Sequence, residues 1–144
     1  MTGEFFEALL DEIDINQEDI DLLSPLVLAY VGDSVYEVFV RTFLVSQGNA
    51  PVHKLHVRST DYVKAKAQSD IIHRIMEFLT PDELDVVRRG RNAKSGTIPK
   101  NADLAEYKYA TGFESLIGSL FLKRQFHRLL EILKLAVNEN TCQE

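Results

Sequence analysis

Residues 24–37 read SPLVLAYVGDSVYE and carry the strongest structural signal of this chain. Ser24 followed by Pro25 is typical of a helix start, because serine caps the first turn and proline is tolerated at the first helical position. The residues that follow are almost wholly apolar, which predicts a helix packed in a core. Asp33 interrupts them, although aspartate is a poor helix former and is rarely buried without a partner or a metal. A divalent cation would explain a carboxylate at this position.

The size and composition of the chain fit one domain with one core. Its 144 residues are 45% hydrophobic, and no apolar run approaches the ~18 residues of a membrane span. A single cysteine, Cys142, and an acidic N-terminus unlike a signal peptide lead us to expect a reducing, cytoplasmic location. The net charge of −6 is unevenly distributed, because residues 1–40 hold ten acids and no Lys or Arg. Residues 41–144 hold sixteen basic residues and twelve acids, a net charge of +4.

Helix signals are strong along the chain, and strand signals are weak. Residues 80–83, TPDE, repeat the cap-then-proline pattern with glutamate at the capping-box position. Gly96 and Pro99 mark a loop over 94–101, and residues 1–16 do not distinguish a short helix from an unstructured segment. The fold class is therefore all-α, a bundle of six or seven helices. Apolar spacing and caps place the helices at about 25–47, 51–56, 59–78 (capped by Ser59 or Thr60), 81–92, 103–122 and 126–137.

Two acids stand beside strongly apolar helix faces, Asp33 and Glu114. Ala29 and Gly32 lie near Asp33, and Gly118 lies one turn after Glu114. Because small residues let helices approach closely, we expect the two helices to cross here and to bring the carboxylates together. Such a pair suits Mg²⁺, which can activate water for hydrolysis of a phosphodiester. The alternative stays open, since a lone acid in an apolar helix is more often a structural residue than a ligand.

A basic segment, residues 88–100, contains five basic residues and no acid. A local cluster of this kind matters more for polyanion binding than the total charge. Glycines and small polar residues alternate with the charges, so backbone amides could also reach phosphates. A merely solvated surface is the alternative, and the absence of a glycine-rich nucleotide motif disfavours nucleotide binding. The predicted RNA-binding residues are Arg88, Arg89, Arg91, Lys94 and Lys100.

The two acidic helices resemble those of the ribonuclease III family. LAYVGDSV at 28–35 is similar to the family's signature helix, and FESLIGSLF at 113–121 is similar to its second acidic helix. RNAKSG at 91–96 and PKN at 99–101 resemble the smaller Mini-ribonuclease III branch. The resemblance covers roughly residues 20–137 and implies a ribonuclease III-like helical endonuclease.

The resemblance also implies an activity and partners. It implies Mg²⁺-dependent cleavage of double-stranded RNA by a homodimer, one strand per subunit, leaving 5′-phosphate and 3′-hydroxyl ends. Asp33 and Glu114 fall on the positions that bind the metal and support catalysis. The implied substrate is the precursor of large-subunit (23S) ribosomal RNA, on which a ribosomal protein could be a further partner. The implied domains are an acidic extension at 1–20, a nuclease domain at 21–138 and a tail at 139–144.

The chain departs from the wider family at two acidic positions. The glutamate usual four residues before the signature aspartate is Ala29 here, and the aspartate usual three residues before the second glutamate is Thr111. The chain is also too short for the separate double-stranded-RNA-binding domain of larger members. We therefore expect the nuclease domain, the basic segment and the dimer surface to bind A-form RNA through its shape, phosphates and 2′-hydroxyls. The alternative is a non-catalytic RNA-binding or ribosome-assembly factor on the same fold.

Overall fold

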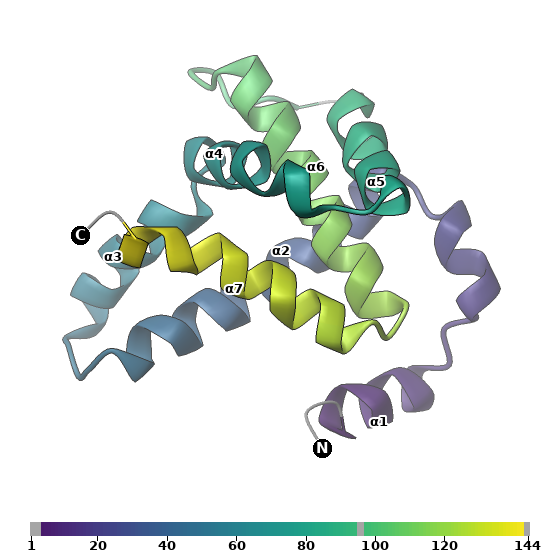
Figure 1. Ribbon diagram of the computed structural model, residues 1–144, viewed down its shortest axis with the longest axis horizontal. Coiled ribbons are helices and arrows are strands. Elements are labelled where there is room, and N and C mark those ends of the chain that lie inside the picture. The colour runs from purple at the N-terminus through teal and green to yellow at the C-terminus, as the bar shows by residue number, and fades with distance from the viewer. Residues whose placement is uncertain (1–3, 95–96, 143–144) are drawn as a thin grey trace.

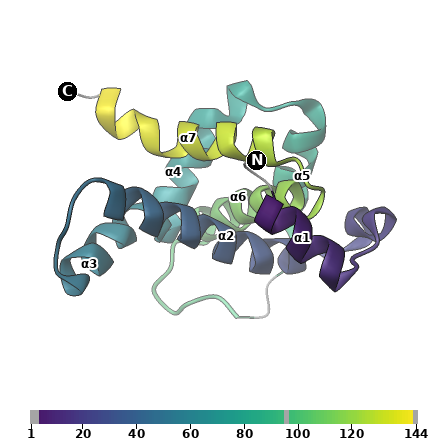
Figure 2. The same cartoon turned by 90° about the horizontal axis from the view of Figure 1, so that it is seen from below.

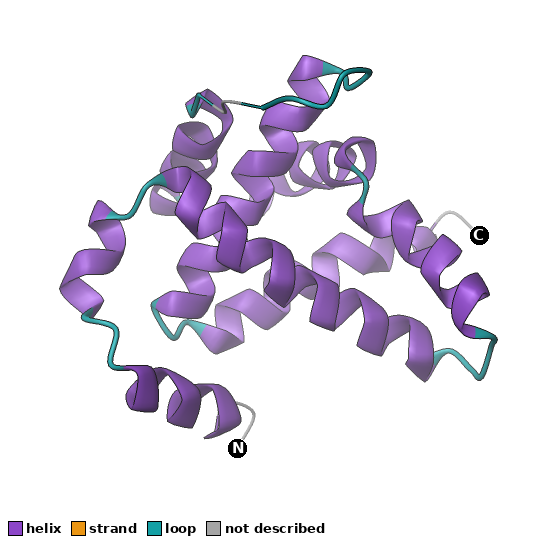
Figure 3. Cartoon of the chain, turned by 180° about the vertical axis from the view of Figure 1, so that it is seen from behind, coloured by secondary structure: helices purple, strands orange, loops and turns teal. Residues whose placement is uncertain are grey.

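The computed structural model describes residues 4–94 and 97–142, and over these residues the regular structure is entirely helical (Figure 3). This confirms the predicted all-α fold. None of the helices in this part of the chain is long and apolar enough to cross a bilayer. In chain order, the elements are α1 (Glu4–Ile13), the 3₁₀ helix η1 (Gln17–Leu22), α2 (Pro25–Ser46), α3 (Val52–Val63), α4 (Ala65–Ile75), the 3₁₀ helix η2 (Met76–Phe78), α5 (Pro81–Asn92), α6 (Leu104–Leu122) and α7 (Phe126–Cys142).

Helix α6 lies at the centre of the bundle, with α2, α4, α5 and α7 packed against it (Figure 1). From Ala110 to Leu122, every residue except Glu114 is buried. A helix that is apolar on all sides belongs in a core, which explains its central place. The rings of Tyr36 and Phe113, both fully buried, meet edge to face with centroids 5.0 Å apart. The core therefore holds the turn that carries Glu114.

The predicted helix starts at 25 and 81 are confirmed. The Ser24 side chain accepts a hydrogen bond from the Leu26 amide at 3.2 Å. The Thr80 hydroxyl accepts from the Glu83 amide at 3.2 Å, while the Glu83 carboxylate accepts from the Thr80 amide at 2.9 Å. Both starts depend on bonds between residues two or three positions apart, so a local pattern was sufficient to predict them.

The prediction of a helix starting at Ser59 or Thr60 is wrong. Both residues lie inside α3, where their hydroxyls donate to carbonyl oxygens one turn earlier and do not cap a helix. The chain instead breaks at Lys64, which has the extended ψ of 154°. One bond at the break comes from another segment, since the Tyr36 hydroxyl of α2 donates to the Tyr62 carbonyl oxygen at 2.9 Å. A second bond is local: Gln68 Nε2, in the first turn of α4, donates to the Val63 carbonyl oxygen at 2.8 Å.

The helices at both ends of the chain differ from what the sequence indicated. In α1, Leu10 is buried, and the Phe6 ring lies 5.3 Å from that of Phe121 and 6.0 Å from that of Phe126. The acidic extension thus contributes side chains to the core. Helix α7 continues to Cys142, past its predicted end at 137.

The predicted loop at 94–101 is confirmed over the residues that the structure describes, and Ser95 and Gly96 lie outside them. Its described residues, 93–94 and 97–103, project from the helical body on the side seen at the bottom of Figure 2. The Asp103 side chain accepts from the Glu106 amide at 3.0 Å and ends the loop by capping α6. The loop therefore presents part of the basic segment away from the core.

Candidate active site

Helices α2 and α6 cross with their backbones in direct contact, because each has a glycine at the crossing. A Cβ atom at Gly32 would lie 1.8 Å from the Glu114 carbonyl oxygen, and one at Gly118 would lie 1.9 Å from the Leu28 carbonyl oxygen. Neither position accepts a larger side chain unless the helices separate. Since Asp33 follows Gly32 directly, this contact sets Asp33 beside Glu114. The predicted crossing is confirmed.

The Asp33 carboxyl lies close enough to alter the ionisation of Glu114. Burial raises the pKa of Glu114 from 4.5 to about 9, together with a hydrogen bond to Asp33 and the negative charge of Asp33. A hydrogen bond from the Gln68 side chain acts in the opposite direction on this pKa. Near neutral pH and without a cation, Glu114 therefore holds a proton. A cation between the two carboxyls would favour the charged form of both.

The two acids differ in exposure. The apolar neighbours of Asp33 suggested a buried carboxylate. For the single chain that prediction is wrong, because α2 directs the Asp33 side chain to solvent. Glu114 is the half-buried member of the pair. Gln68 reaches the pair from α4 and was missed, because a lone glutamine in a helical pattern carries no sequence signal. The pair thus has one member open to solvent and one held by the core.

Two neighbouring positions hold small side chains in place of acids. Ala29 is buried one turn before Asp33, and Thr111 is buried one turn before Glu114. The Thr111 hydroxyl donates to the Tyr107 carbonyl oxygen at 3.0 Å. In the part of the chain that the structure describes, no group of three or more His, Cys, Asp or Glu could hold a metal ion. The remaining carboxylate pair fits Mg²⁺, which takes one or two protein carboxylates and completes its shell with water.

The arginines of the basic segment on α5 have an acid beside them. Asp85, one turn earlier, forms ion pairs with both Arg88 and Arg89, and its carboxylate lies 3.3 Å from Arg89 Nε. Hydrogen bonding from Arg88, opposed by a smaller burial effect, lowers the pKa of Asp85, so the acid remains charged. Asp85 stands just outside the acid-free segment in the sequence. It reduces the positive charge that these two arginines can offer to a phosphate.

The other three basic residues are arranged differently. Arg91 donates to the Tyr109 hydroxyl at 3.4 Å, and its guanidinium carbon lies 5.6 Å from the centre of the Tyr109 ring. This contact holds Arg91 near α6. Lys94 and Lys100 are exposed in the loop. The structure therefore places the open positive charge of the segment in the loop rather than on α5.

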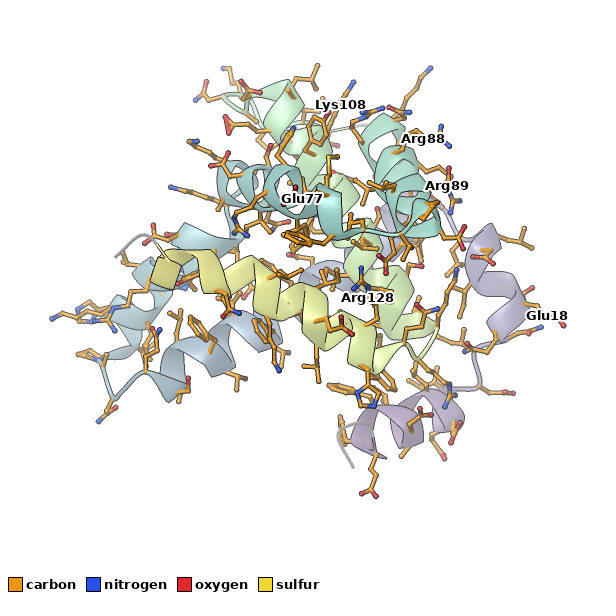
Figure 4. All side chains as sticks on the ribbon, in the orientation of Figure 1. Glu18, Glu77, Arg88, Arg89, Lys108 and Arg128 are labelled. Carbon is orange, nitrogen blue, oxygen red and sulfur yellow. The ribbon has the colours of Figure 1, made fainter. Side chains whose placement is uncertain are left out.

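A hollow of about 420 Å³ lies between the loop and the start of α6, and its lining includes Lys94, Lys108 and Thr111. Thr111 is one turn before Glu114, so the hollow extends from the basic loop to within one helical turn of the second acid. Lys108 was missed because it lies on α6, outside the basic segment. Its side chain lies in the same upper part of Figure 4 as that of Arg88.

Comparison with known protein families agrees with this arrangement. The family model described as the ribonuclease III domain matches residues 26–125, a span that includes both Asp33 and Glu114. The chain therefore belongs to the ribonuclease III family of endoribonucleases.

Within that family, the chain belongs to the Mini-ribonuclease 3 branch. It is 50% identical over 123 residues to the Mini-ribonuclease 3 of Thermoanaerobacter sp. (strain X514), covering 85% of this chain and 87% of that one. It is 52% identical over 116 residues to the Mini-ribonuclease 3 of Symbiobacterium thermophilum, covering 81% of this chain and 89% of that one. A crystal structure of a Fusobacterium nucleatum protein has a TM-score of 0.76 and 29% identity, over 85% of this chain and 98% of that one.

Proposed function

We propose that this chain is an Mg²⁺-dependent endoribonuclease that cleaves double-stranded RNA, with Asp33 and Glu114 as its metal-binding and catalytic residues. The observation that carries the proposal is the carboxylate pair at the α2–α6 crossing. There, the close approach of Asp33 helps to raise the pKa of Glu114 to about 9. A divalent cation is the natural counter-charge for such a pair.

The two carboxylates have separate tasks in this proposal. Glu114, on the buried helix α6, would help to fix the position of a bound cation, while Asp33, which faces solvent, would hold the cation where a phosphodiester can reach it. Bound Mg²⁺ supplies charge neutralisation at the phosphate and a water molecule of lowered pKa. In the hydrolysis, a water oxygen bonds to phosphorus and the bond from phosphorus to the 3′ oxygen breaks. The water's proton goes to solvent and the 3′ oxygen takes one up, which leaves 5′-phosphate and 3′-hydroxyl ends.

The basic segment would bind the RNA backbone. A-form RNA is recognised mainly through its shape, phosphates and 2′-hydroxyls, which suits cations on a projecting loop. The nuclease domain, residues 21–138, would act as a homodimer that cuts one strand per subunit. Its substrate would be the 23S ribosomal RNA precursor in the cytoplasm, with a ribosomal protein on that RNA as a candidate partner. The proposed phosphate contacts are Arg88, Arg89, Arg91, Lys94 and Lys100.

The direct test is cleavage of a duplex RNA by Asp33→Asn. We expect the Mg²⁺-dependent rate to fall about 100-fold or more, because the variant lacks a carboxylate that would hold the metal whose charge stabilises the reacting phosphate. The matched control is Asp70→Asn, since Asp70 is an exposed acid paired with Lys66 at 3.1 Å on the surface of α4. Cleavage products of the 23S precursor, mapped at both ends, test the substrate assignment.

The same experiment separates the enzyme from a non-catalytic RNA-binding factor. Wild-type protein that binds duplex RNA but does not cut it with Mg²⁺ would favour the binding factor. Equal cleavage by Asp33→Asn, or full cleavage in the presence of a chelator, would contradict the proposed site.

A further inference from the structure

Helix α3 carries a second group of cations, outside the basic segment. Residues 38–60 contain no Asp or Glu. Among the residues that the structure describes, no ion pair reaches Lys54 or Arg58, although Asp61 lies three positions after Arg58. The exposed side chains of α3 that are, or can become, positively charged are His53, Lys54, His56 and Arg58.

The stability of α3 does not explain this arrangement. Lys54 and Arg58 are four positions apart, so two like charges are neighbours on the helix surface, which is unfavourable. Lys54 also lies in the first turn, where the helix dipole disfavours positive charge. Local rules of this kind are typically broken at functional surfaces, where a ligand offsets the cost. A polyanion would supply the counter-charge that α3 lacks.

One face of α2 connects this group of cations to the carboxylate pair. Leu26, Asp33 and Leu44 share that face, because they are seven and eleven residues apart, close to two and three full turns. Leu26 lines the hollow beside the projecting loop, whereas Leu44 lines a second hollow, of about 180 Å³, together with His56 of α3. Along α2, Asp33 is about 10 Å from the first of these leucines and about 16 Å from the second. In Figure 2, the loop and α3 both lie in the lower half of the molecule.

We propose that Lys54 and Arg58 bind backbone phosphates of the same duplex RNA that the projecting loop contacts, on the other side of the carboxylate pair. The inference rests on the proposed function. Cations on both sides of Asp33 would hold the duplex across the acids and prevent it from pivoting about the loop. A duplex carries a regular row of phosphates, which suits two separated cationic surfaces. Such contacts would position the RNA without reading its base sequence.

The test measures the affinity for duplex RNA in chelator at several salt concentrations. For Lys54→Gln and Arg58→Gln combined, we expect the slope of log affinity against log salt to fall by about 2, one for each phosphate no longer bound. Lys54→Gln alone should lower the slope by about 1. The matched control Lys134→Gln removes an exposed lysine of α7 and should leave the slope unchanged. Asp61→Asn removes the one acid of α3 and should strengthen binding.

Two further measurements separate RNA contact from a structural role. The melting temperature of the double variant should stay at or above that of wild type, because the variant removes a like-charge pair. Hydroxyl-radical footprints in chelator should lose protection at nucleotides other than those that lose it in Lys94→Gln.

A wild-type salt slope in the double variant, or an equal change in Lys134→Gln, would overturn the inference. If the wild type cleaves duplex RNA and the double variant binds it as the wild type does, only the role of α3 fails. A wild-type protein that does not bind duplex RNA overturns both proposals.

Discussion

Asp33 and Glu114 are chemically similar acids that the fold treats differently. Asp33 is open to solvent, whereas Glu114 is the one residue between Ala110 and Leu122 that is not buried outright. Burial is the first cause of the raised pKa of Glu114, and the Asp33 carboxyl is the second. Without a cation, the Glu114 carboxyl of the folded protein is therefore protonated near neutral pH. The site is arranged so that a cation can replace that proton.

This proton predicts how the stability of the metal-free protein depends on pH. The pKa of Glu114 is about 9 in the folded protein, and its ordinary value of 4.5 applies to the unfolded chain. Between these two pH values, only the folded protein holds the proton. The stabilising contribution is complete below the ordinary pKa and is lost as the pH rises through the folded one. From about pH 6 to about pH 8, we expect the free energy of unfolding to fall by about 1 to 3 kcal/mol in chelator.

Chemical denaturation of wild type and Glu114→Gln at the two pH values measures this effect. Glutamine has no proton to release, so the variant should lose much less stability over the same interval. An identical loss in both proteins would show that Glu114 is not the group responsible.

The crossing of α2 and α6 is the element that creates the pair. Each helix contributes a glycine, and the backbone of the other helix occupies the space where a side chain would stand. Glycine inside a helix is unfavourable compared with alanine, so its presence here has a packing reason. The spacing of the two helices, rather than the acids alone, sets the geometry of the site.

We predict that Gly32→Ala destabilises the protein by about 2 to 4 kcal/mol and abolishes cleavage. Its Cβ would lie 1.8 Å from the Glu114 carbonyl oxygen, so the helices must move apart. Thermal unfolding and a cleavage assay measure the two effects. The control is Ser34→Ala at an exposed position of α2, which should change stability by less than about 0.5 kcal/mol. Wild-type stability in Gly32→Ala would contradict the close crossing.

The charge of the whole molecule is unevenly distributed along the sequence. The net charge is −6, yet residues 1–40 carry ten of the acids and no Lys or Arg. Part of this acidity is paired within the chain, since Arg124 lies 2.8 Å from Asp11 and Asp21 forms an ion pair with Lys123 at 2.6 Å. In the projecting loop, Lys94 and Lys100 are exposed, and Lys94 lines the hollow that also includes Thr111. A total charge of −6 is therefore compatible with a polyanionic substrate.

Neutralising the basic segment should weaken RNA binding and its dependence on salt. For Arg89→Gln, Arg91→Gln and Lys94→Gln combined, we expect the slope of log affinity against log salt to fall by about 1 for each phosphate that the variant no longer binds. Because Asp85 already pairs with Arg89, Lys94→Gln alone should account for more of the change than Arg89→Gln alone. The control is Lys134→Gln, an exposed lysine on α7. An unchanged slope in the triple variant would show that the segment faces away from RNA.

The proposed division of work between two subunits predicts the products of a mixed dimer. A dimer of one wild-type and one Asp33→Asn subunit, isolated with two affinity tags, should cut one strand of the duplex and leave the other intact. Native and denaturing gels distinguish nicked from fully cut RNA. Cutting of both strands at the wild-type rate would contradict one active site per strand.

Local capping chemistry made several helix boundaries predictable. Ser24 and Thr80 mark the starts of α2 and α5, because each cap involves a bond to an amide two or three residues away. The α3–α4 boundary at Lys64 has no glycine or proline to mark it, and it is held by Tyr36 from α2 and by Gln68. The bond from Tyr36 joins residues 26 positions apart, which a local pattern cannot contain.

The amino-acid sequence was enough to identify the helical fold, the two acids and the basic segment, because apolar periodicity and isolated charges are visible along the chain. Folding was needed to place Asp33 in solvent and to bring it close to Glu114. The pairing of Asp85 with Arg88 and Arg89 is local to α5, at spacings of three and four residues, so the helical pattern was enough to contain it. Ionisation, metal affinity and charge pairing depend on distance through space and on burial. At the carboxylate pair, distance and burial are set by contacts between residues far apart in the sequence, such as Gly32 and Glu114.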